Sequence, residues 1–138
     1  MTATAWYSPQ TPTEAFDNIS RTSNGSNGWT FPGYGSTFVS CSSLSNQAEI
    51  TAVWEGQLSI RSVDLQAYAS QAVSETYTVC GTTDGGSTWS QIGQASEMVS
   101  SSYTNLSIPV TSGSYDGLEV FAVSGLSWIG IAQVTVNG

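Results

Sequence analysis

The sequence predicts an all-β protein, a single β-sandwich of about eight antiparallel strands in a jelly-roll-like arrangement. Hydrophobic and polar residues alternate along several segments, which is the period-2 pattern of half-buried strands. Gly, Asn, Ser and Pro separate these segments, and those residues favour turns. No ten-residue stretch combines a helical period with a cap and a stop signal. The length of 138 residues suits one domain, residues 1–138.

The strands are expected in the segments where this alternation is clearest. These are Thr37–Ser42, Ala48–Trp54, Gln57–Ala69, Glu75–Gly81, Trp89–Gln94, Leu106–Val110, Leu118–Val123 and Ile129–Val136. In the third segment, Leu58 and Ile60 share one parity, whereas Val63 and Leu65 share the other. The switch at Arg61–Ser62 predicts a β-bulge, or a strand that crosses from one sheet to the other.

One segment, Ser20–Gly35, differs from the strands. It contains two Asn-Gly pairs and three aromatic residues, Trp29, Phe31 and Tyr34, among Gly and Pro. Asn-Gly pairs favour tight turns with positive φ. We therefore expect a long ordered loop, and such loops in compact domains often carry function.

The charge composition excludes several classes of function. The chain has ten acidic residues and two basic ones, Arg21 and Arg61, so its net charge is −8, and it has no Lys and no His. Nucleic acid and anionic membranes are therefore unsuitable partners. Without His or Lys, the Ser–His–Asp, Cys–His and Schiff-base mechanisms are impossible. Two Cys without His cannot build a zinc site, and we expect neither a metal nor a cofactor.

Paired carboxylates could in principle hydrolyse a glycosidic bond. The acidic residues near expected strands or turns are Glu49, Glu55, Asp116 and Glu119. Ten scattered acids with almost no bases are more simply explained as a solubilising surface. We therefore expect no catalytic residue and no enzymatic activity.

The segment Thr82–Trp89 carries the sharpest local motif. Its sequence, Thr-Thr-Asp-Gly-Gly-Ser-Thr-Trp, resembles the Asp-box, [Ser/Thr]-x-Asp-x-Gly-x-Thr-Trp, at each defined position. The resemblance implies a β-hairpin turn in which the Asp84 carboxylate accepts backbone N–H groups, Gly86 takes a positive φ and Trp89 packs under the hairpin. Sialidase-like propellers repeat this box in each blade, whereas this chain has it once, so a structural turn is expected.

The C-terminal segment Trp128–Asn137 resembles the closing strand of galactose-binding-like jelly rolls, a fold common among carbohydrate-binding modules. That strand usually carries acidic residues near a structural calcium, and this chain has Ala132 and Gln133 there. Aromatic rings can stack on the apolar faces of sugars. The candidates for glycan binding are Trp29, Tyr34 and Trp89; the alternative is that tryptophans are core residues, which we expect of Trp54 and Trp128.

The two cysteines, Cys41 and Cys80, leave two alternatives open. They could form a disulfide that closes a loop of about 40 residues and stabilises the fold by a few kcal/mol, or they could be two buried thiols. The N-terminal residues Met-Thr-Ala-Thr-Ala-Trp form neither a basic nor an apolar signal region. This observation favours the thiols.

The first functional hypothesis is a phage structural protein. With a start that lacks a secretion signal and a composition rich in Ser, Thr, Gly and Asn, the chain is similar to small jelly-roll decoration or cement proteins of capsids, or to a small tail-associated domain. That resemblance implies a homo-oligomer, often a trimer, that bridges major capsid proteins in the virion. Residues 1–12 would be a docking arm that carries Trp6, Tyr7, Pro9 and Pro12; an ordinary first edge strand is the alternative.

The second hypothesis is a carbohydrate-binding module of a larger secreted enzyme. It would bind a glycan outside the cell through loop aromatic residues, and the composition fits it equally well. Oligomeric state and aromatic exposure distinguish the two, because a sugar-binding monomer exposes its rings whereas a virion protein buries its arm in a symmetric array.

Overall fold

The computed structural model describes residues 2–5, 29–32, 40–41, 49–69, 71–123 and 128–138 of the chain. These residues form antiparallel strands, and none of them is helical, so the described part contains no helix able to cross a membrane. The strands are β1 (Thr2–Ala5), β2 (Trp29–Pro32), β3 (Glu49–Ala69), β4 (Val73–Thr82), β5 (Ser90–Val99), β6 (Thr104–Val123) and β7 (Trp128–Asn137).

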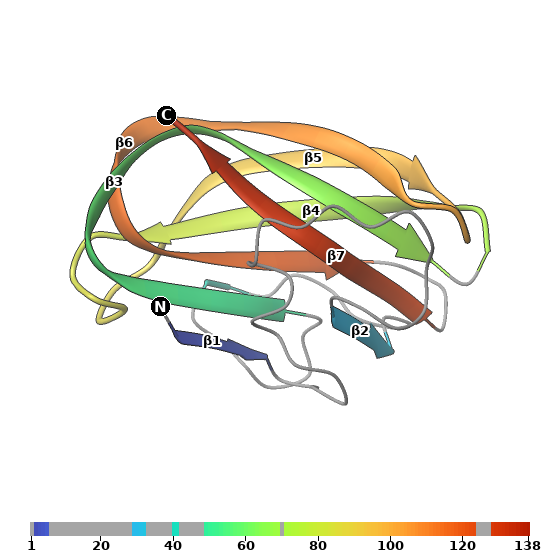
Figure 1. Cartoon of the computed structure of the whole chain (residues 1–138), viewed down its shortest axis with the longest axis horizontal. Helices are drawn as coiled ribbons and strands as arrows, with labels where there is room; N and C mark the ends of the chain where they lie inside the picture. The colour runs from blue at the N-terminus through green and yellow to red at the C-terminus, as the bar shows by residue number, and fades with distance from the viewer. Residues whose placement is uncertain (1, 6–28, 33–39, 42–48, 70, 124–127) are drawn as a thin grey trace.

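Two long strands, β3 and β6, bend together and so build both layers of a sandwich (Figure 1). The register between them is interrupted between Val53 and Leu58, and Gly56 lies in this gap with φ 75°. A positive φ is easy for glycine because it has no Cβ. The halves of each strand on either side of the bend therefore lie in different layers.

The pairing defines the two layers. The first layer has the order β1, the first half of β3, the second half of β6, β4 and β5. The second layer has the order β2, β7, the second half of β3 and the first half of β6. We call these the first and second layers below.

The core lies between the layers and follows the period-2 alternation of the strands. On β3, Val63, Leu65, Ala67 and Ala69 are all at most 1% exposed. The facing layer contributes every second residue along β4 and along the second half of β6. These residues are Tyr77, Val79, Leu118, Val120 and Ala122. Full burial of an aliphatic side chain stabilises a fold by about 1.5–3 kcal/mol.

The core also contains polar groups. Glu75 shares its parity with Tyr77 on β4, and both are fully buried. Burial, assisted by the negative charge of Glu75, raises the pKa of the Tyr77 hydroxyl well above its usual range. Tyr77 is therefore a neutral phenol at any physiological pH.

The observed strands confirm the all-β sandwich and refine its parts. The segments Ala48–Trp54 and Gln57–Ala69 are one strand, β3, because pairing with β6 resumes after the bend. The first layer also includes β1 and the second layer includes β2, two strands that periodicity did not identify; Trp29–Pro32 is a strand and not a loop. Ser40 and Cys41 are not in a strand, and the rest of Thr37–Ser42 lies outside the described residues.

The strand is irregular at Arg61, where the sequence predicts a β-bulge or a crossing between sheets. Ile60 pairs with Gly113 and Ser62 pairs with Pro109, so the register shifts between them. The crossing between layers is a separate event and occurs earlier, at Gly56. The register shift at Arg61 fits the first alternative, whereas the crossing between layers does not occur at Arg61–Ser62, where the second alternative placed it.

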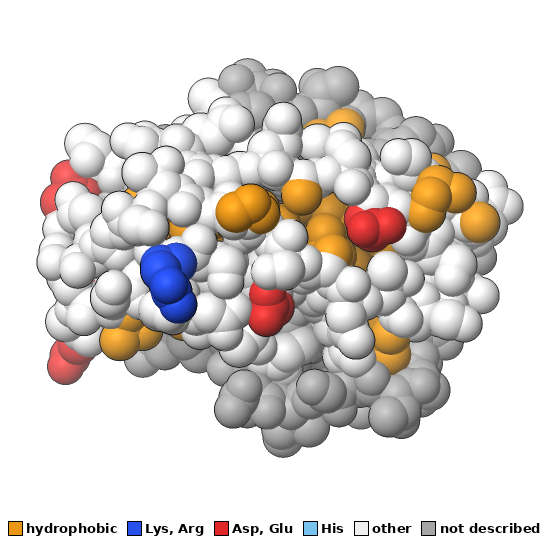
Figure 2. Space-filling view, turned by 90° about the horizontal axis from the view of Figure 1, so that it is seen from above, with side chains coloured by type: hydrophobic (Ala, Val, Ile, Leu, Met, Phe, Trp, Pro, Cys, Tyr) orange, Lys and Arg blue, Asp and Glu red, His pale blue; other side chains and the backbone are white. Residues whose placement is uncertain are grey.

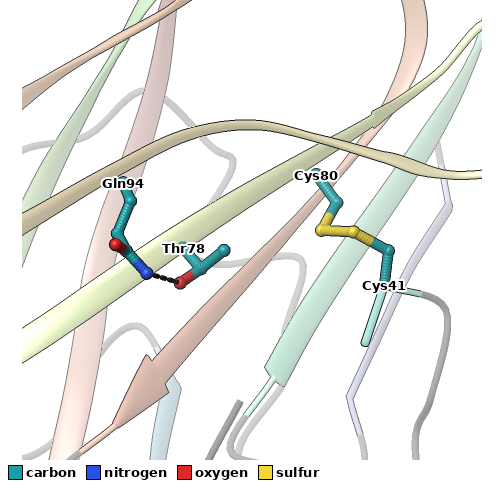
Figure 3. Close-up of a disulfide and its surroundings, with 4 residues drawn as sticks. All are labelled: Cys41, Thr78, Cys80 and Gln94. Atoms are coloured by element: carbon teal, nitrogen blue, oxygen red, sulfur yellow. Dashed lines mark hydrogen bonds between the residues drawn. A yellow bond between two sulfur atoms is a disulfide. The ribbon is translucent and has the colours of Figure 1, made fainter. Parts of the chain in front are cut away.

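Cys41 and Cys80 are joined by a disulfide across 39 positions of the sequence, with Cα atoms 6.0 Å apart (Figure 3). The preference for two thiols is therefore wrong, because it rested on the first residues of the chain and not on the geometry of the cysteines. Cys80 lies on the outer side of β4 beside Thr78, and both are fully buried. Thr78 accepts a hydrogen bond from Gln94 Nε2 at 2.9 Å.

Candidate functional site

A shallow groove of about 390 Å³ lies on the outer face of the second layer, over β6, β3 and β7. Its polar side chains form two rows across the three strands: Ser107, Asp64 and Thr135, then Asn105, Gln66 and Gln133. Residues two apart on a strand share a face, so the register alone brings these six together. We call this site the sheet groove. Its volume falls within the range of small-ligand sites, about 300–1,000 Å³.

The sheet groove exists because β3 is amphipathic. Val63 and Leu65 point into the core, so Asp64 and Gln66 point outward. Figure 2 views the molecule from the side of β3, β5 and β6, and shows a surface on which uncharged side chains predominate and carboxylates are sparse. The described lining of the groove itself is polar apart from Leu65 and Leu106.

The depth of the six side chains differs. Gln66 and Gln133 are 8% and 5% exposed, so their amides form the floor, and Gln133 Nε2 donates to the Val134 carbonyl at 3.2 Å. Asp64 and Thr135 are half-buried, whereas Asn105 and Ser107 are exposed. Buried amides are held in place by their surroundings, while the rim side chains can reach a ligand.

Four of these side chains are free to bind a ligand. Among the residues that the structure describes, no hydrogen bond involves the side chains of Asp64, Asn105, Ser107 or Thr135. A carboxylate accepts, a hydroxyl donates and accepts, and an amide does both through separate atoms. The groove therefore offers donors and acceptors on both sides of β3.

An aromatic pair lies next to the two polar rows. Tyr68 follows Gln66 by two residues on β3, and its ring contacts the ring of Tyr103 edge to face, with centroids 5.2 Å apart. Tyr68 pairs with Gly130 of β7, and a Cβ atom on that glycine would lie only 2.3 Å from Tyr68 Cζ. Gly130 thus allows the tyrosine ring to lie against the backbone, and the half-buried Tyr103 stands beside it.

The Asp-box-like hairpin is a second polar structure, at the end where β3 and β6 bend. Asp84 Oδ1 accepts the Thr88 N–H at 2.9 Å, and Thr82 Oγ1 accepts the Gly86 N–H at 3.0 Å. Gly86 has φ 95°, and its carbonyl accepts the Trp89 indole N–H at 3.0 Å. These bonds hold the backbone of the turn internally, as a structural turn requires.

The hairpin is also tied to the bend. The Gly85 N–H donates to both carboxylate oxygens of Asp116 on β6, at 3.0 and 3.1 Å, and Gln57 Nε2 of β3 donates to the Thr83 carbonyl at 3.2 Å. The hydrogen bonds from Thr88, first from its hydroxyl and then from its backbone, lower the pKa of the Asp84 carboxyl to about 2. Both carboxylates are therefore used in fixing the turn.

The structure separates the residues expected to bind sugars. Trp89 is half-buried, and its ring packs against Gly86 of the hairpin and Gly117 of β6, not at the sheet groove. Trp29 lies on β2, paired with Ile131, and its side chain is not described; Tyr34 lies outside the described residues. Trp54 packs against the core, and its indole N–H donates to the Tyr115 carbonyl at 3.1 Å.

The expected docking arm is only partly described. Thr2–Ala5 pairs with β3 as an edge strand, which is the alternative stated for this segment. Its aromatic and proline residues, Trp6, Tyr7, Pro9 and Pro12, lie outside the described residues. Among the described residues, no three acidic, His or Cys side chains lie close enough together to hold a metal ion.

Sequence reasoning missed all six residues of the sheet groove. The signal that could have revealed them is the alternation along β3. Asp64, Gln66 and Tyr68 alternate with apolar core residues and so must face outward. Their partners Asn105 and Gln133 are distant in sequence, and only the strand register brings them close.

Comparison with known proteins shows the fold. No protein-family profile matches the chain, and no curated protein matches it significantly. Among solved structures, the CBM32 of AlyQ in complex with 4,5-unsaturated mannuronic acid is 14% identical with a TM-score of 0.67, over 99% of this chain and 93% of that chain. A pectin-binding carbohydrate-binding module is 13% identical with a TM-score of 0.59, over 99% and 88%.

A third similar structure is chitosan-binding module 1 of a chitosanase/glucanase from Paenibacillus sp. IK-5. It is 16% identical with a TM-score of 0.60, over 99% of this chain and 92% of that chain. The chain also matches truncated AlyQ with CBM32 and alginate lyase domains, where it covers 31% of the longer chain at a TM-score of 0.66. The fold is therefore a β-sandwich of the kind that carbohydrate-binding modules have.

These matches contradict the hypothesis of a phage decoration protein. The first three similar structures described above are carbohydrate-binding modules, and none of these comparisons supports a capsid partner, a trimer or a place in the virion. The hypothesis was wrong because a hydroxyl-rich, lysine-free surface is common to proteins that work outside cells. Such a composition does not separate a virion protein from a secreted one.

Proposed function

We propose that the protein is a non-catalytic carbohydrate-binding module that holds a glycan in the sheet groove. The observation that carries this proposal is the set of four side chains, Asp64, Asn105, Ser107 and Thr135, that line one groove and form no side-chain hydrogen bond within the described part of the chain. Sugar hydroxyls both donate and accept, so they match carboxylate, amide and hydroxyl groups in two rows.

The aromatic pair supports the same function. Tyr103 is half-buried beside Tyr68, at the end of the polar rows. The face of a pyranose ring carries C–H groups, which pack on the flat surface of an aromatic ring. A glycan lying along β3 would therefore form hydrogen bonds with the two polar rows and pack its next sugar unit on the aromatic pair.

We place this function outside the cell. The disulfide between Cys41 and Cys80 supports this, because disulfides form and persist in oxidising compartments. The module would hold an attached or neighbouring protein on its polysaccharide. Residues 1–138 would act as one domain.

Affinity electrophoresis through gels containing different soluble polysaccharides tests the proposal. The wild type should be retarded by at least one polysaccharide, and the double variant Asn105→Ala/Ser107→Ala should lose most of this retardation. Both residues are exposed, so their replacement should leave the fold intact. Gln91→Ala, which removes an exposed glutamine from β5 in the first layer, is the matched control and should behave like the wild type.

A second variant distinguishes the groove from the aromatic segment around β2. If Trp29→Ala abolishes retardation while the groove variant keeps it, the protein binds glycans at the site expected from the sequence and the sheet groove is not that site. If no polysaccharide retards the wild type, the proposed function is wrong.

A further inference from the structure

The electrostatics of the sheet groove suggest which class of glycan it takes. Among the described residues that line the groove, Asp64 is the only one with a charged side chain. It is half-buried, and no hydrogen bond to its carboxylate is present within the described part of the chain. A half-buried carboxylate interacts with a ligand charge more strongly than an exposed one does, because less water screens it.

No positive charge compensates Asp64 in the described structure. Arg61, on the same strand, is exposed, and its Nη2 donates to the Gly138 carbonyl at 2.9 Å, at the end of β7. The other basic residue, Arg21, lies outside the described residues. The whole chain carries a net charge of −8, so the long-range field around the groove is negative as well.

We infer that the sheet groove binds an amino-sugar glycan, with the Asp64 carboxylate accepting a hydrogen bond from a sugar ammonium group. This inference rests on the proposed function and specifies its ligand. Ser107 of β6 and Thr135 of β7 pair with Asp64 from the two sides of β3. Their hydroxyls lie where they can form hydrogen bonds with the hydroxyls of the same sugar unit.

The same charges exclude glycans rich in uronic acid. A uronate in the groove would bring a second carboxylate next to Asp64, and no Arg or Lys among the described lining residues would neutralise either one. Like charges that are forced together oppose binding and so give specificity. The groove therefore differs in ligand class from a site built for polyuronates, even where the surrounding fold is the same.

Isothermal titration with three oligosaccharides tests the inference: a β-1,4-linked glucosamine hexamer, its fully N-acetylated form and a galacturonate hexamer. The measurement is made at a pH at which the amine is protonated. The glucosamine hexamer should bind at least about fivefold more tightly than the N-acetylated form, and the galacturonate hexamer most weakly. Asp64→Asn should bring the first two affinities close together.

Glu55→Gln is the matched control, because it removes one negative charge at an exposed residue of the bend, outside the groove. It should preserve the preference for the amine. Equal binding of the two glucosamine forms by the wild type, or an equal loss of preference in both variants, overturns the inference. In that case, glycan binding that remains sensitive to Asn105→Ala leaves the proposed function intact, whereas absence of binding to every glycan contradicts both.

Discussion

Asp84 and Thr88 form two hydrogen bonds across the β4–β5 turn. The Thr88 N–H donates to Asp84 Oδ1 at 2.9 Å, and the Thr88 hydroxyl donates to Oδ2 at 2.6 Å. Thr82 Oγ1 donates to the same Oδ1 at 2.8 Å. Together these donors favour the ionised carboxylate, so the pKa of Asp84 falls to about 2.

The first prediction follows from this shift. A group whose pKa is lowered by folding stabilises the native state above its unfolded pKa, about 3.9 for Asp, and loses that contribution as the pH falls through the folded pKa. Asp84→Asn should therefore lower Tm at neutral pH. The difference from the wild type should shrink between about pH 4 and pH 2, as thermal unfolding followed by circular dichroism would show. Parallel Tm curves across this range would contradict the assignment.

The second prediction concerns Gly130. An added Cβ would lie 2.3 Å from Tyr68 Cζ and 2.6 Å from Cε1, so Gly130→Ala forces the ring or the strand to move. Overpacking of this kind costs about 1–3 kcal/mol of unfolding free energy. Urea denaturation followed by circular dichroism measures the loss.

A double-mutant cycle separates the ring contact from a general intolerance of β7 to alanine. In the Tyr68→Ala background, the ring is absent, and Gly130→Ala should cost much less than in the wild type. An equal cost in both backgrounds would show that the ring is not responsible.

The fold was largely predictable from the sequence, because alternation is local. The alternation of Val63 and Leu65 with polar residues predicts a strand without any knowledge of the strands that pair with it. The joining of two expected strands into β3 was not predictable, since it depends on Gly56 and on where the partner β6 resumes its register. The short strand β2 was missed, and β1 was expected only as the alternative to a docking arm, because four residues have little periodicity of their own and are fixed by their partners.

The candidate site was much less predictable. Asp64, Asn105 and Gln133 come from three strands, and their proximity depends on two pairings with different registers. The Asp-box-like turn could be identified because its residues Thr82–Trp89 are contiguous, so its hydrogen bonds are encoded locally. Local motifs revealed a structural feature, whereas the groove is a property of the assembled sheet.

The third prediction concerns the disulfide. In the chain-entropy account, a bond that closes a loop of 39 residues stabilises the native state by about 4 kcal/mol by restricting the unfolded chain. The double variant Cys41→Ala/Cys80→Ala should therefore unfold at a clearly lower urea concentration, and a reducing agent should shift the wild type in the same direction. A reducing agent that leaves the wild-type midpoint unchanged would show that the disulfide does not form in the protein.

The last prediction concerns the aromatic pair, Tyr68 and Tyr103, that lies beside the sheet groove. Tyr103 stands edge to face against Tyr68, with an interplanar angle of 72°, and is only half-buried. If its ring packs against a sugar, Tyr103→Ala should weaken glycan binding by about threefold to tenfold, whereas Tyr103→Phe keeps the ring and should bind almost as well. Titration of both variants with the polysaccharide that retards the wild type measures this. An equal loss in the two variants would assign the effect to the hydroxyl, and an unchanged affinity in Tyr103→Ala would place the glycan on the polar rows alone.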